Sequence, residues 1–381
     1  MPPVKITRIE GRAYRVPIVN PVRTSFGTMR DRPAVFVRIE DQHGHFGWGE
    51  VFCNWPSAGA EHRVRVMMED MADLILGAEL ADAQTLYNKL SRETRIRALQ
   101  CGEPGPFAQV TSGLDVAAHD LFARRAGLPL RKLLNPNAPD FVPAYASGIQ
   151  VDHAERVLPD LRSRGIKAHK VKVGFDAERD ISLVCELLVD RRKGERLFAD
   201  ANQKWTVPEA LNFMRGVAGR GLVWIEEPIP ADNPPEDWKT LADAGLVPIA
   251  AGENITGLQD FAATLDAGFL DFIQPDVAKW GGITGAMAIS AMAKRTGATF
   301  CMHFLGGGVG LAASAECLAA SGSDGLLEVD VNFNPLRDAF GGMDRIDVNG
   351  NYRMENHLGL GIDDIPAELE KFGTLRLQKG L

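Results

Sequence analysis

The sequence predicts an α/β protein in which a modified (β/α)₈ barrel follows an α+β N-terminal domain. The chain has 381 residues, enough for a barrel of about 250 residues and a second domain. Beyond Phe141, short apolar runs alternate with helical segments, which is typical of a parallel sheet. Most of these runs end in charged or amide side chains, which in a closed barrel would meet at one mouth. An open, doubly wound sheet is the alternative, but it would spread the polar residues along an edge.

The amino-acid composition excludes some classes of function. A net charge of −8 and a pI near 5.6 argue against a nucleic-acid surface, which needs a basic face. No apolar run approaches the roughly 18 residues of a membrane span, and the first residues lack the apolar core of a signal peptide. The five cysteines are odd in number and show no CxxC spacing. We therefore expect reduced thiols in a cytoplasmic protein that binds a small molecule.

Residues 1–130 are expected to form the α+β domain. Alternating apolar residues predict antiparallel strands at Val4–Val16, Ala34–Glu40 and Phe46–Glu50. Helical periodicity follows at Glu61–Leu76, Ala83–Leu90 and Ser112–Ala126. Two segments rich in Gly, Pro, Ser and Asn, Asn20–Asp31 and Phe52–Gly59, are expected to be long loops, either mobile connections or lids.

Residues 131–350 are expected to form the barrel, and residues 351–381 to return to the first domain. Eight apolar runs predict the barrel strands: Val142–Ser147, His169–Gly174, Leu197–Ala201, Val223–Pro228, Pro248–Gly252, Phe272–Pro275, Thr299–His303 and Gly325–Val331. Helical patterns between them include Asp176–Val189, Val207–Ala218 and Gly281–Thr296. Eight strands alternating with helices favour closure of the sheet into a barrel.

Three carboxylates end consecutive strands of this predicted barrel. Asp200, Glu226 and Glu253 should therefore be neighbours around the rim, where they could not all stay ionised without a cation. All-oxygen ligation with room for water or substrate suits Mg²⁺, whereas zinc usually takes His or Cys ligands. Unrelated surface salt bridges are the alternative, but the regular spacing of the three residues disfavours it.

Two lysines and a histidine provide candidate bases. Lys170 and Lys172 lie two apart on one strand and so share a face, where each should lower the pKa of the other. Asp276 and His303 end the sixth and seventh strands, and an aspartate beside a histidine fixes its tautomer and raises its basicity. A solvated lysine pair and a structural histidine are the alternatives.

A fourth acidic residue, Glu328, ends the eighth strand among apolar neighbours. Such a carboxyl can be kept protonated and donate a hydrogen bond, or it can pair with Arg337. A metal and two bases around one mouth suggest a substrate between them. A carboxylate substrate on Mg²⁺ has a more acidic α-hydrogen, because the metal stabilises the enolate that forms.

The motifs together resemble the enolase superfamily, and within it the mandelate racemase subgroup, over the whole chain. They are Lys170-Val171-Lys172, Asp200-Ala201-Asn202, Trp224-Ile225-Glu226-Glu227-Pro228, Gly252-Glu253-Asn254, Gln274-Pro275-Asp276 before Gly281-Gly282, and His303. The resemblance implies a modified TIM barrel with an α+β capping domain and a Mg²⁺ site at Asp200, Glu226 and Glu253. The muconate cycloisomerase and dipeptide epimerase branches are less similar, because they carry lysine where Asp276 stands.

The resemblance also implies roles for the remaining residues. Lys172, tuned by Lys170, would be one base and His303 with Asp276 the other, while Glu328 would hydrogen-bond the enolate oxygen. Substrate contacts would come from Asn202 and, on the two loops over the mouth, from Ser25, Arg30, Asn54 and Trp55.

The fate of the enolate stays open at this stage. Dehydration of an aldonate or aldarate to a 2-keto-3-deoxy acid is the first hypothesis. Racemisation or epimerisation of a 2-hydroxy acid, or cycloisomerisation, is the second, and a non-catalytic binding or structural barrel is a remote third. By resemblance we also expect a homo-oligomer, either a dimer or an octamer.

Overall fold

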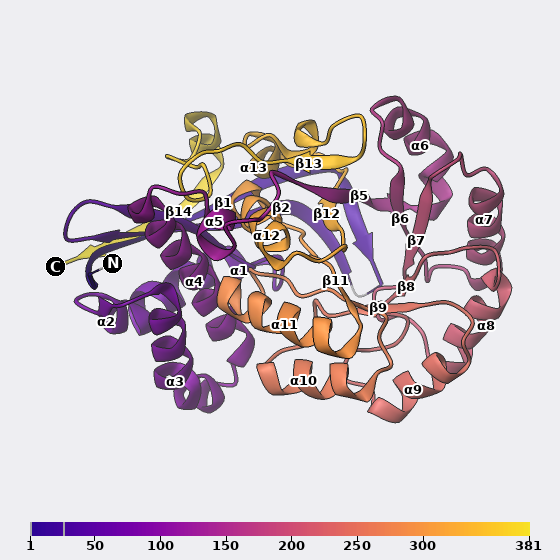
Figure 1. Ribbon diagram of the computed structural model, residues 1–381, viewed down its shortest axis with the longest axis horizontal. Helices are drawn as coiled ribbons and strands as arrows, with labels where there is room; N and C mark the ends of the chain where they lie inside the picture. The colour runs from indigo at the N-terminus through magenta and orange to yellow at the C-terminus, as the bar shows by residue number, and fades with distance from the viewer. Residues whose placement is uncertain (1, 26) are drawn as a thin grey trace.

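A computed structural model describes residues 2–25 and 27–381 (Figure 1). The first part of the chain forms an antiparallel sheet of β1 (Val4–Thr24), β2 (Gly27–Asp41) and β3 (Phe46–Val51). The C-terminal strand β14 (Gly373–Gly380) pairs antiparallel with β1, as does the short β4 (Glu79–Leu80). The two ends of the chain therefore lie side by side at this end of the molecule.

The β1–β2 hairpin is longer than the sequence suggests. The predicted loop Asn20–Asp31 was wrong, because pairing resumes beyond a bulge and continues to Thr24 opposite Gly27. Phe26, in the same range, lies outside the described residues. Proline, glycine and serine in this range signal a loop, but cross-strand pairing within the hairpin holds the segment extended. The hairpin thereby reaches toward the barrel mouth (Figure 1).

Helices cover one face of this sheet. They are α1 (Gly59–Arg65), a π-helical turn (Val66–Met71), α2 (Ala72–Ile75), α3 (Ala83–Cys101) and α4 (Pro104–Ala126), with α5 (Leu130–Leu134) leading to the barrel. Helix α4 lies directly on β3, since a Cβ on Gly47 or Gly49 would come within 2.0 Å of a backbone carbonyl of α4. Helices α3 and α4 both exceed the predicted ranges. Pro104 occupies the first turn of α4, where a missing N–H costs nothing.

The rest of the chain forms an eight-stranded parallel sheet. Its strands are β5 (Phe141–Gln150), β6 (Ala168–Lys172), β7 (Arg196–Asp200), β8 (Ile225–Glu226), β9 (Ile249–Ala251), β10 (Phe272–Ile273), β11 (Thr299–Phe300) and β12 (Leu327–Asp330). The order runs from β11 back to β5 and then β12. A parallel bridge between Met302 and Leu327 joins the two end strands, so the sheet closes. Each predicted barrel strand overlaps one of these, and the predicted barrel is confirmed.

The crossover helices lie outside the sheet (Figure 1). They are α6 (Ala154–Ser163), α7 (Ala177–Val189), α8 (Val207–Val217), α9 (Pro235–Asp243), α10 (Leu258–Ala267), α11 (Gly282–Thr296) and α12 (Gly308–Ser321). The short α13 (Pro335–Asp338) follows the last barrel strand. The small strand β13 (Asn351–Arg353) pairs antiparallel with β5. Tyr145, Phe198 and Trp224 fill the barrel interior, and the last two rings stack with centroids 3.9 Å apart.

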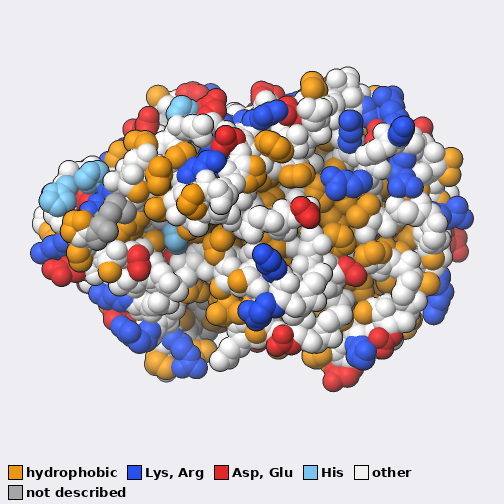
Figure 2. Space-filling model, in the orientation of Figure 1, with side chains coloured by type: hydrophobic (Ala, Val, Ile, Leu, Met, Phe, Trp, Pro, Cys, Tyr) orange, Lys and Arg blue, Asp and Glu red, His pale blue; other side chains and the backbone are white. Residues whose placement is uncertain are grey.

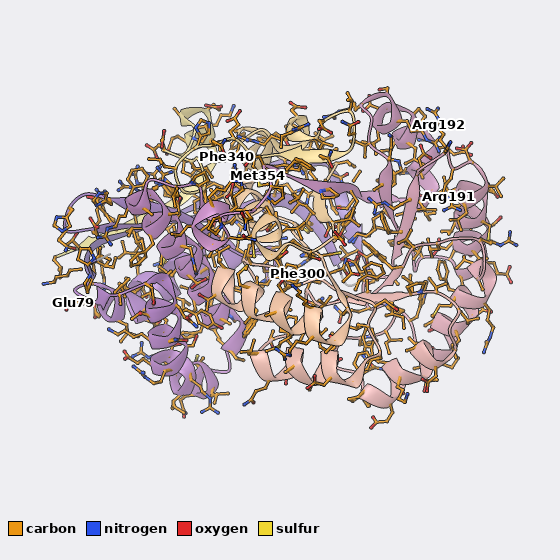
Figure 3. All side chains as sticks on the ribbon, in the orientation of Figure 1. Glu79, Arg191, Arg192, Phe300, Phe340 and Met354 are labelled. Atoms are coloured by element: carbon orange, nitrogen blue, oxygen red, sulfur yellow. The ribbon has the colours of Figure 1, made fainter. Side chains whose placement is uncertain are left out.

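The face of the molecule drawn in Figure 2 has no large patch of a single charge. Lys and Arg side chains are interspersed with Asp and Glu (Figure 2). In the described chain, no helix is long and apolar enough to cross a membrane. Phe340 and Met354 lie close together in Figure 3 and line a cavity of about 440 Å³ beneath the C-terminal segment. The candidate catalytic residues line a different cavity.

Candidate active site

A cavity of about 400 Å³ lies between the barrel mouth and the first domain, which caps it. The barrel lines it with residues that follow the strand ends, among them Lys172, Asn202, Glu253, Lys279, His303, Glu328 and Asp330. The cap lines it with Val22, Thr24, Met29 and Arg32 from the hairpin and with Phe52, Asn54 and Trp55 from the loop after β3. The cavity thus combines charged groups from the barrel with a largely apolar cover.

The two lysines of β6 are embedded among carboxylates. Lys170 Nζ lies 2.6 Å from Glu226 Oε1 and 2.9 Å from Glu328 Oε1, and Lys172 Nζ lies 2.5 Å from Asp200 Oδ2. The strand register explains this, since Lys172 is paired with Asp200 on β7, and Asp200 with Glu226 on β8. Glu328 therefore pairs with Lys170 and not with Arg337.

The protonation of the lysines differs from the prediction. Burial alone would lower the pKa of Lys170, but Glu226 and Glu328 raise it well above its usual value. At Lys172, burial also lowers the pKa, but the attraction of Asp200 outweighs burial and raises the pKa above its usual value. The mutual effect of the two lysines, which the spacing suggested would lower both pKa values, is smaller than the attraction of the carboxylates.

Asp276 and His303 form a pair on the opposite side of the cavity from Lys172 in barrel order. His303 Nδ1 lies 2.8 Å from Asp276 Oδ2, while its Nε2 lies 3.2 Å from Glu253 and 3.7 Å from Glu328. Burial would lower the pKa of His303, but Glu253, Glu328 and Asp276 raise it to about 9. The imidazole is therefore a cation near neutral pH in this arrangement.

Glu328 carries a negative charge in the same arrangement. Burial raises the pKa of its carboxyl, yet Lys170 and His303 outweigh burial and lower it below the usual range. The expectation that Glu328 is kept protonated was therefore wrong for these surroundings. The apolar neighbours in the sequence lie on the other face of the strand or beside it, whereas two cations face the carboxylate.

The three candidate metal ligands fit a divalent cation by their chemistry. Burial, together with Asp200 and Glu328, raises the pKa of Glu226 to about 7 although Lys170 is adjacent. Trp224 Nε1 and Gln274 Nε2 donate to Glu226 at 3.3 and 2.9 Å and so fix its orientation. All three ligands are oxygen donors, the set that Mg²⁺ prefers.

Glu253 is not directed at the other two carboxylates. No group of three or more His, Cys, Asp or Glu side chains within residues 2–25 and 27–381 is close enough to hold a metal as it stands. Glu253 Oε2 instead contacts Lys279 Nζ at 3.0 Å and His303 Nε2 at 3.2 Å. In this arrangement Glu253 thus pairs with two cationic side chains rather than with a three-carboxylate site.

Backbone strain is concentrated beside the carboxylates. Asn202, Gln203 and Glu227 are the non-glycine residues with positive φ in the described chain, at 46°, 64° and 41°. Each follows a strand that ends in a candidate metal ligand, and Gln203 N donates to Glu227 O at 2.7 Å. Such conformations cost free energy and persist where surrounding contacts fix them, often at functional sites.

The cap residues predicted to contact substrate divide into two groups. Asn54 and Trp55 line the cavity, and Asn54 Nδ2 donates to Leu305 O at 3.0 Å. Ser25 Oγ donates to the backbone oxygen of Asn202, which joins the hairpin to the barrel. Arg30 is exposed and lies outside the residues that line the cavity, so the structure does not bring it to the site.

Two residues for which the sequence indicated no role, Lys279 and Arg32, line the cavity, and a third, Glu50, binds the N-terminus of α12. Lys279 contacts Glu253 and donates to Asn254 Oδ1 at 2.7 Å. Arg32 from the cap lines the cavity, and Glu50 accepts hydrogen bonds from Gly307 N at 2.5 Å and Gly310 N at 2.7 Å. The sequence carried a signal only for Lys279, which follows Asp276 by three residues and so returns to the same rim within one turn.

The protein is a capped (β/α)₈ barrel. Clustered carboxylates, lysines and an Asp–His pair lie at its mouth, an arrangement typical of an enzyme active site. The N-terminal domain of the mandelate racemase / muconate lactonizing enzyme family matches residues 8–135, and the enolase C-terminal domain-like family matches residues 152–365. The chain therefore belongs to the mandelate racemase/muconate lactonizing enzyme family of the enolase superfamily.

Characterised relatives carry several different activities in their names. The chain is 27% identical to D-galactarolactone cycloisomerase of Agrobacterium fabrum, over 94% of this chain and 96% of that one. It is 30% identical to L-talarate/galactarate dehydratase of Salmonella typhimurium, over 76% and 73% of the two chains. Both lyases and isomerases are thus among its relatives.

Solved structures agree with the fold. A mandelate racemase/muconate lactonizing enzyme from Bordetella bronchiseptica RB50 superposes with a TM-score of 0.90 and 39% identity, over 97% of this chain and 99% of that one. L-Talarate dehydratase from Polaromonas sp. JS666, complexed with Mg and L-glucarate, superposes with a TM-score of 0.82 and 25% identity over 99% of each chain.

Proposed function

We propose that this protein is a Mg²⁺-dependent enzyme that removes the α-proton of an acid sugar and eliminates its β-hydroxyl. The observation that carries the proposal is the placement of Lys172 and His303 on one cavity, next to the carboxylate Glu253. A substrate held between them would meet a nitrogen base on one side and an imidazolium on the other. The Mg complexes of similar structures support the metal.

Asp200, Glu226 and Glu253 would hold the metal. When bound, Mg²⁺ supplies positive charge for the enolate and competes with the lysines for these carboxylates. Lys172 Nζ would then take the α-proton, and Lys170 would keep the neighbouring charge positive. Glu328, which contacts Lys170 and His303, would keep these two cations in place on either side of the enolate.

His303 would complete the reaction. Its raised pKa keeps Nε2 protonated near neutral pH, and this proton passes to the β-hydroxyl, which leaves as water. The remaining enol becomes a 2-keto-3-deoxy acid by taking up a proton at C3. Asp276 holds the imidazole by Nδ1 throughout, so Nε2 stays directed at the cavity.

Cycloisomerisation or racemisation is the second candidate, because relatives with 27% and 31% identity are named cycloisomerases. The partial reaction at the α-carbon is the same in each case. Incubation with Mg²⁺ and a panel of acid sugars, assayed for 2-oxo acids, tests dehydration. Exchange of the α-hydrogen in D₂O without any oxo acid would contradict dehydration and favour the second candidate.

A further inference from the structure

The cavity has a second charged corner, away from the lysines and carboxylates described above. Arg32, on β2 of the cap, and Asp330, the last residue of β12, form an ion pair of 2.8 Å. Both are buried, with 3% and 2% of their surface exposed, and both line the cavity. The pair joins the cap to the barrel and is also a wall of the substrate space.

The position of this corner relative to Glu328 follows from the strand. Glu328 and Asp330 are two residues apart on β12, so their side chains point to the same face. The strand advances by roughly 7 Å between them. A substrate with its carboxylate near Glu328 and an extended carbon chain would therefore bring its far end close to Arg32.

The hydrogen bonds of the corner engage both oxygens of Asp330 and leave one N–H group of each arginine without a hydrogen-bond partner among the described residues. Asp330 Oδ1 accepts from Asn332 N at 3.0 Å and Asn332 Nδ2 at 2.7 Å, and Oδ2 accepts from Arg32 Nη2. Arg337 Nη1 lies 3.5 Å from the same Oδ2, so one carboxylate is shared by two guanidinium groups. Arg32 Nε is buried without a partner among the described residues.

Arg32 lines the cavity and keeps an unpartnered N–H group, so it favours a ligand that brings acceptor oxygens. A guanidinium has five N–H donors and no acceptor, and it matches the two oxygens of a carboxylate. A hydroxyl at the same place would also need an acceptor for its own proton, and both oxygens of Asp330 already accept hydrogen bonds, from Asn332 and from Arg32.

We infer that Arg32 binds a second carboxylate at the far end of the substrate, so that the preferred substrates are aldarates rather than aldonates. This inference rests on the proposed function, because it names the other end of the same substrate. The alternative is that the Arg32–Asp330 pair only fastens the cap to the barrel. A fastening would affect stability but would not discriminate between the two substrate classes.

The test compares kcat/KM for aldarates and for aldonates of matched configuration, with Mg²⁺, in the wild type and three variants. Arg32→Met should lower kcat/KM for the aldarate by about 10- to 100-fold and change that for the aldonate by less than about 3-fold. Arg32→Lys should retain part of the preference. Asp330→Asn should increase the preference, because it removes the carboxylate that competes for the guanidinium.

Arg38→Met is the matched control, since Arg38 lies on the same strand, pairs with Glu40 at 2.6 Å and does not line the cavity. It should leave both substrates unaffected. Equal losses on both substrates in Arg32→Met, or the same direction of change in Arg32→Met and Asp330→Asn, would overturn the inference and leave the proposed function standing. If the wild type neither turns over any acid sugar nor exchanges its α-hydrogen, the proposed function itself fails and the inference with it.

Discussion

His303 Nδ1 lies 2.8 Å from Asp276 Oδ2, and this contact determines which ring nitrogen of His303 faces the cavity. The other oxygen of Asp276 accepts from Ala278 N at 2.8 Å, so the carboxylate is held by its own backbone turn. The imidazole is thereby fixed between Asp276 behind it and Glu253 in front of it. His303 can deliver a proton only from Nε2, which is the side where a substrate would lie.

Replacement of Asp276 by Asn should alter the pH dependence of catalysis. The amide can keep the hydrogen bond from Ala278 N but offers His303 an N–H in place of a negative charge, so the pKa of His303 falls. With the higher pKa of about 9, the imidazolium is retained until the pH rises through that value. The alkaline limb of kcat/KM should therefore move to lower pH in Asp276→Asn, and kcat should fall by at least about 100-fold. An unchanged alkaline limb would show that His303 is not the acid.

Mutation of the carboxylate ligands should weaken metal binding measurably. We expect Glu253→Gln and Asp200→Asn each to lower Mg²⁺ affinity by at least about tenfold in calorimetric titration, since each loses an anionic oxygen donor. Removal of metal with EDTA should abolish turnover, and added Mg²⁺ should restore it. Asp243→Asn is a control, because Asp243 is exposed and pairs only with Lys239 in the described chain. Turnover that persists in EDTA would contradict the metal assignment.

The parts of the fold that depend on local sequence were predictable. Apolar runs such as Leu197–Ala201 predict buried strands, and Asp200 is the last residue of the strand β7 that forms there. The hairpin extension to Thr24 was not predictable, because it depends on pairing with residues after a turn rich in loop-forming residues. The loop-forming propensity of single residues and the pairing of the two strands disagree there, and the pairing dominates.

The sequence predicted which residues form the site better than it predicted their protonation states. Spacing placed Lys170 and Lys172 on one face, but it did not reveal that Glu226, Glu328 and Asp200 surround them. Electrostatics depends on the full set of neighbours, which only the folded chain assembles. Arg32 was missed for the same reason, since its partner Asp330 is 298 positions away in the sequence.

Glu50 links the cap to the N-terminus of α12 and should make stability depend on pH. Burial raises the pKa of its carboxyl from about 4.5 to about 7, despite hydrogen bonds from Gly310 and Gly307, and Asp276 adds to the increase. Because the folded state binds the proton more tightly, the contribution of Glu50 is full below pH 4.5 and is lost as the pH rises through about 7.

The variant Glu50→Gln isolates this effect. The wild type should lose about 3 kcal/mol relative to Glu50→Gln between pH 4.5 and pH 8, measured as the difference in unfolding free energy in urea. At low pH the variant should be less stable by about 1 kcal/mol, because the amide keeps one acceptor oxygen for two backbone N–H groups. A difference that does not vary with pH would show that Glu50 is ionised throughout.

Lys172 and His303 should be separable by hydrogen exchange, because they approach the substrate from different sides of the cavity. In D₂O with Mg²⁺, Lys172→Ala should abolish exchange of the α-hydrogen for the configuration that faces Lys172, as followed by NMR. His303→Asn should retain that exchange and lose the oxo-acid product, since the enolate still forms but the β-hydroxyl has no acid to protonate it. The reverse pattern would assign His303 as the abstracting base, and no change in either variant would contradict the two-base arrangement. Arg191→Met, on the outer side of the barrel (Figure 3), is a control that should affect neither measurement, because Arg191 donates to the backbone oxygens of Arg220 and Gly221.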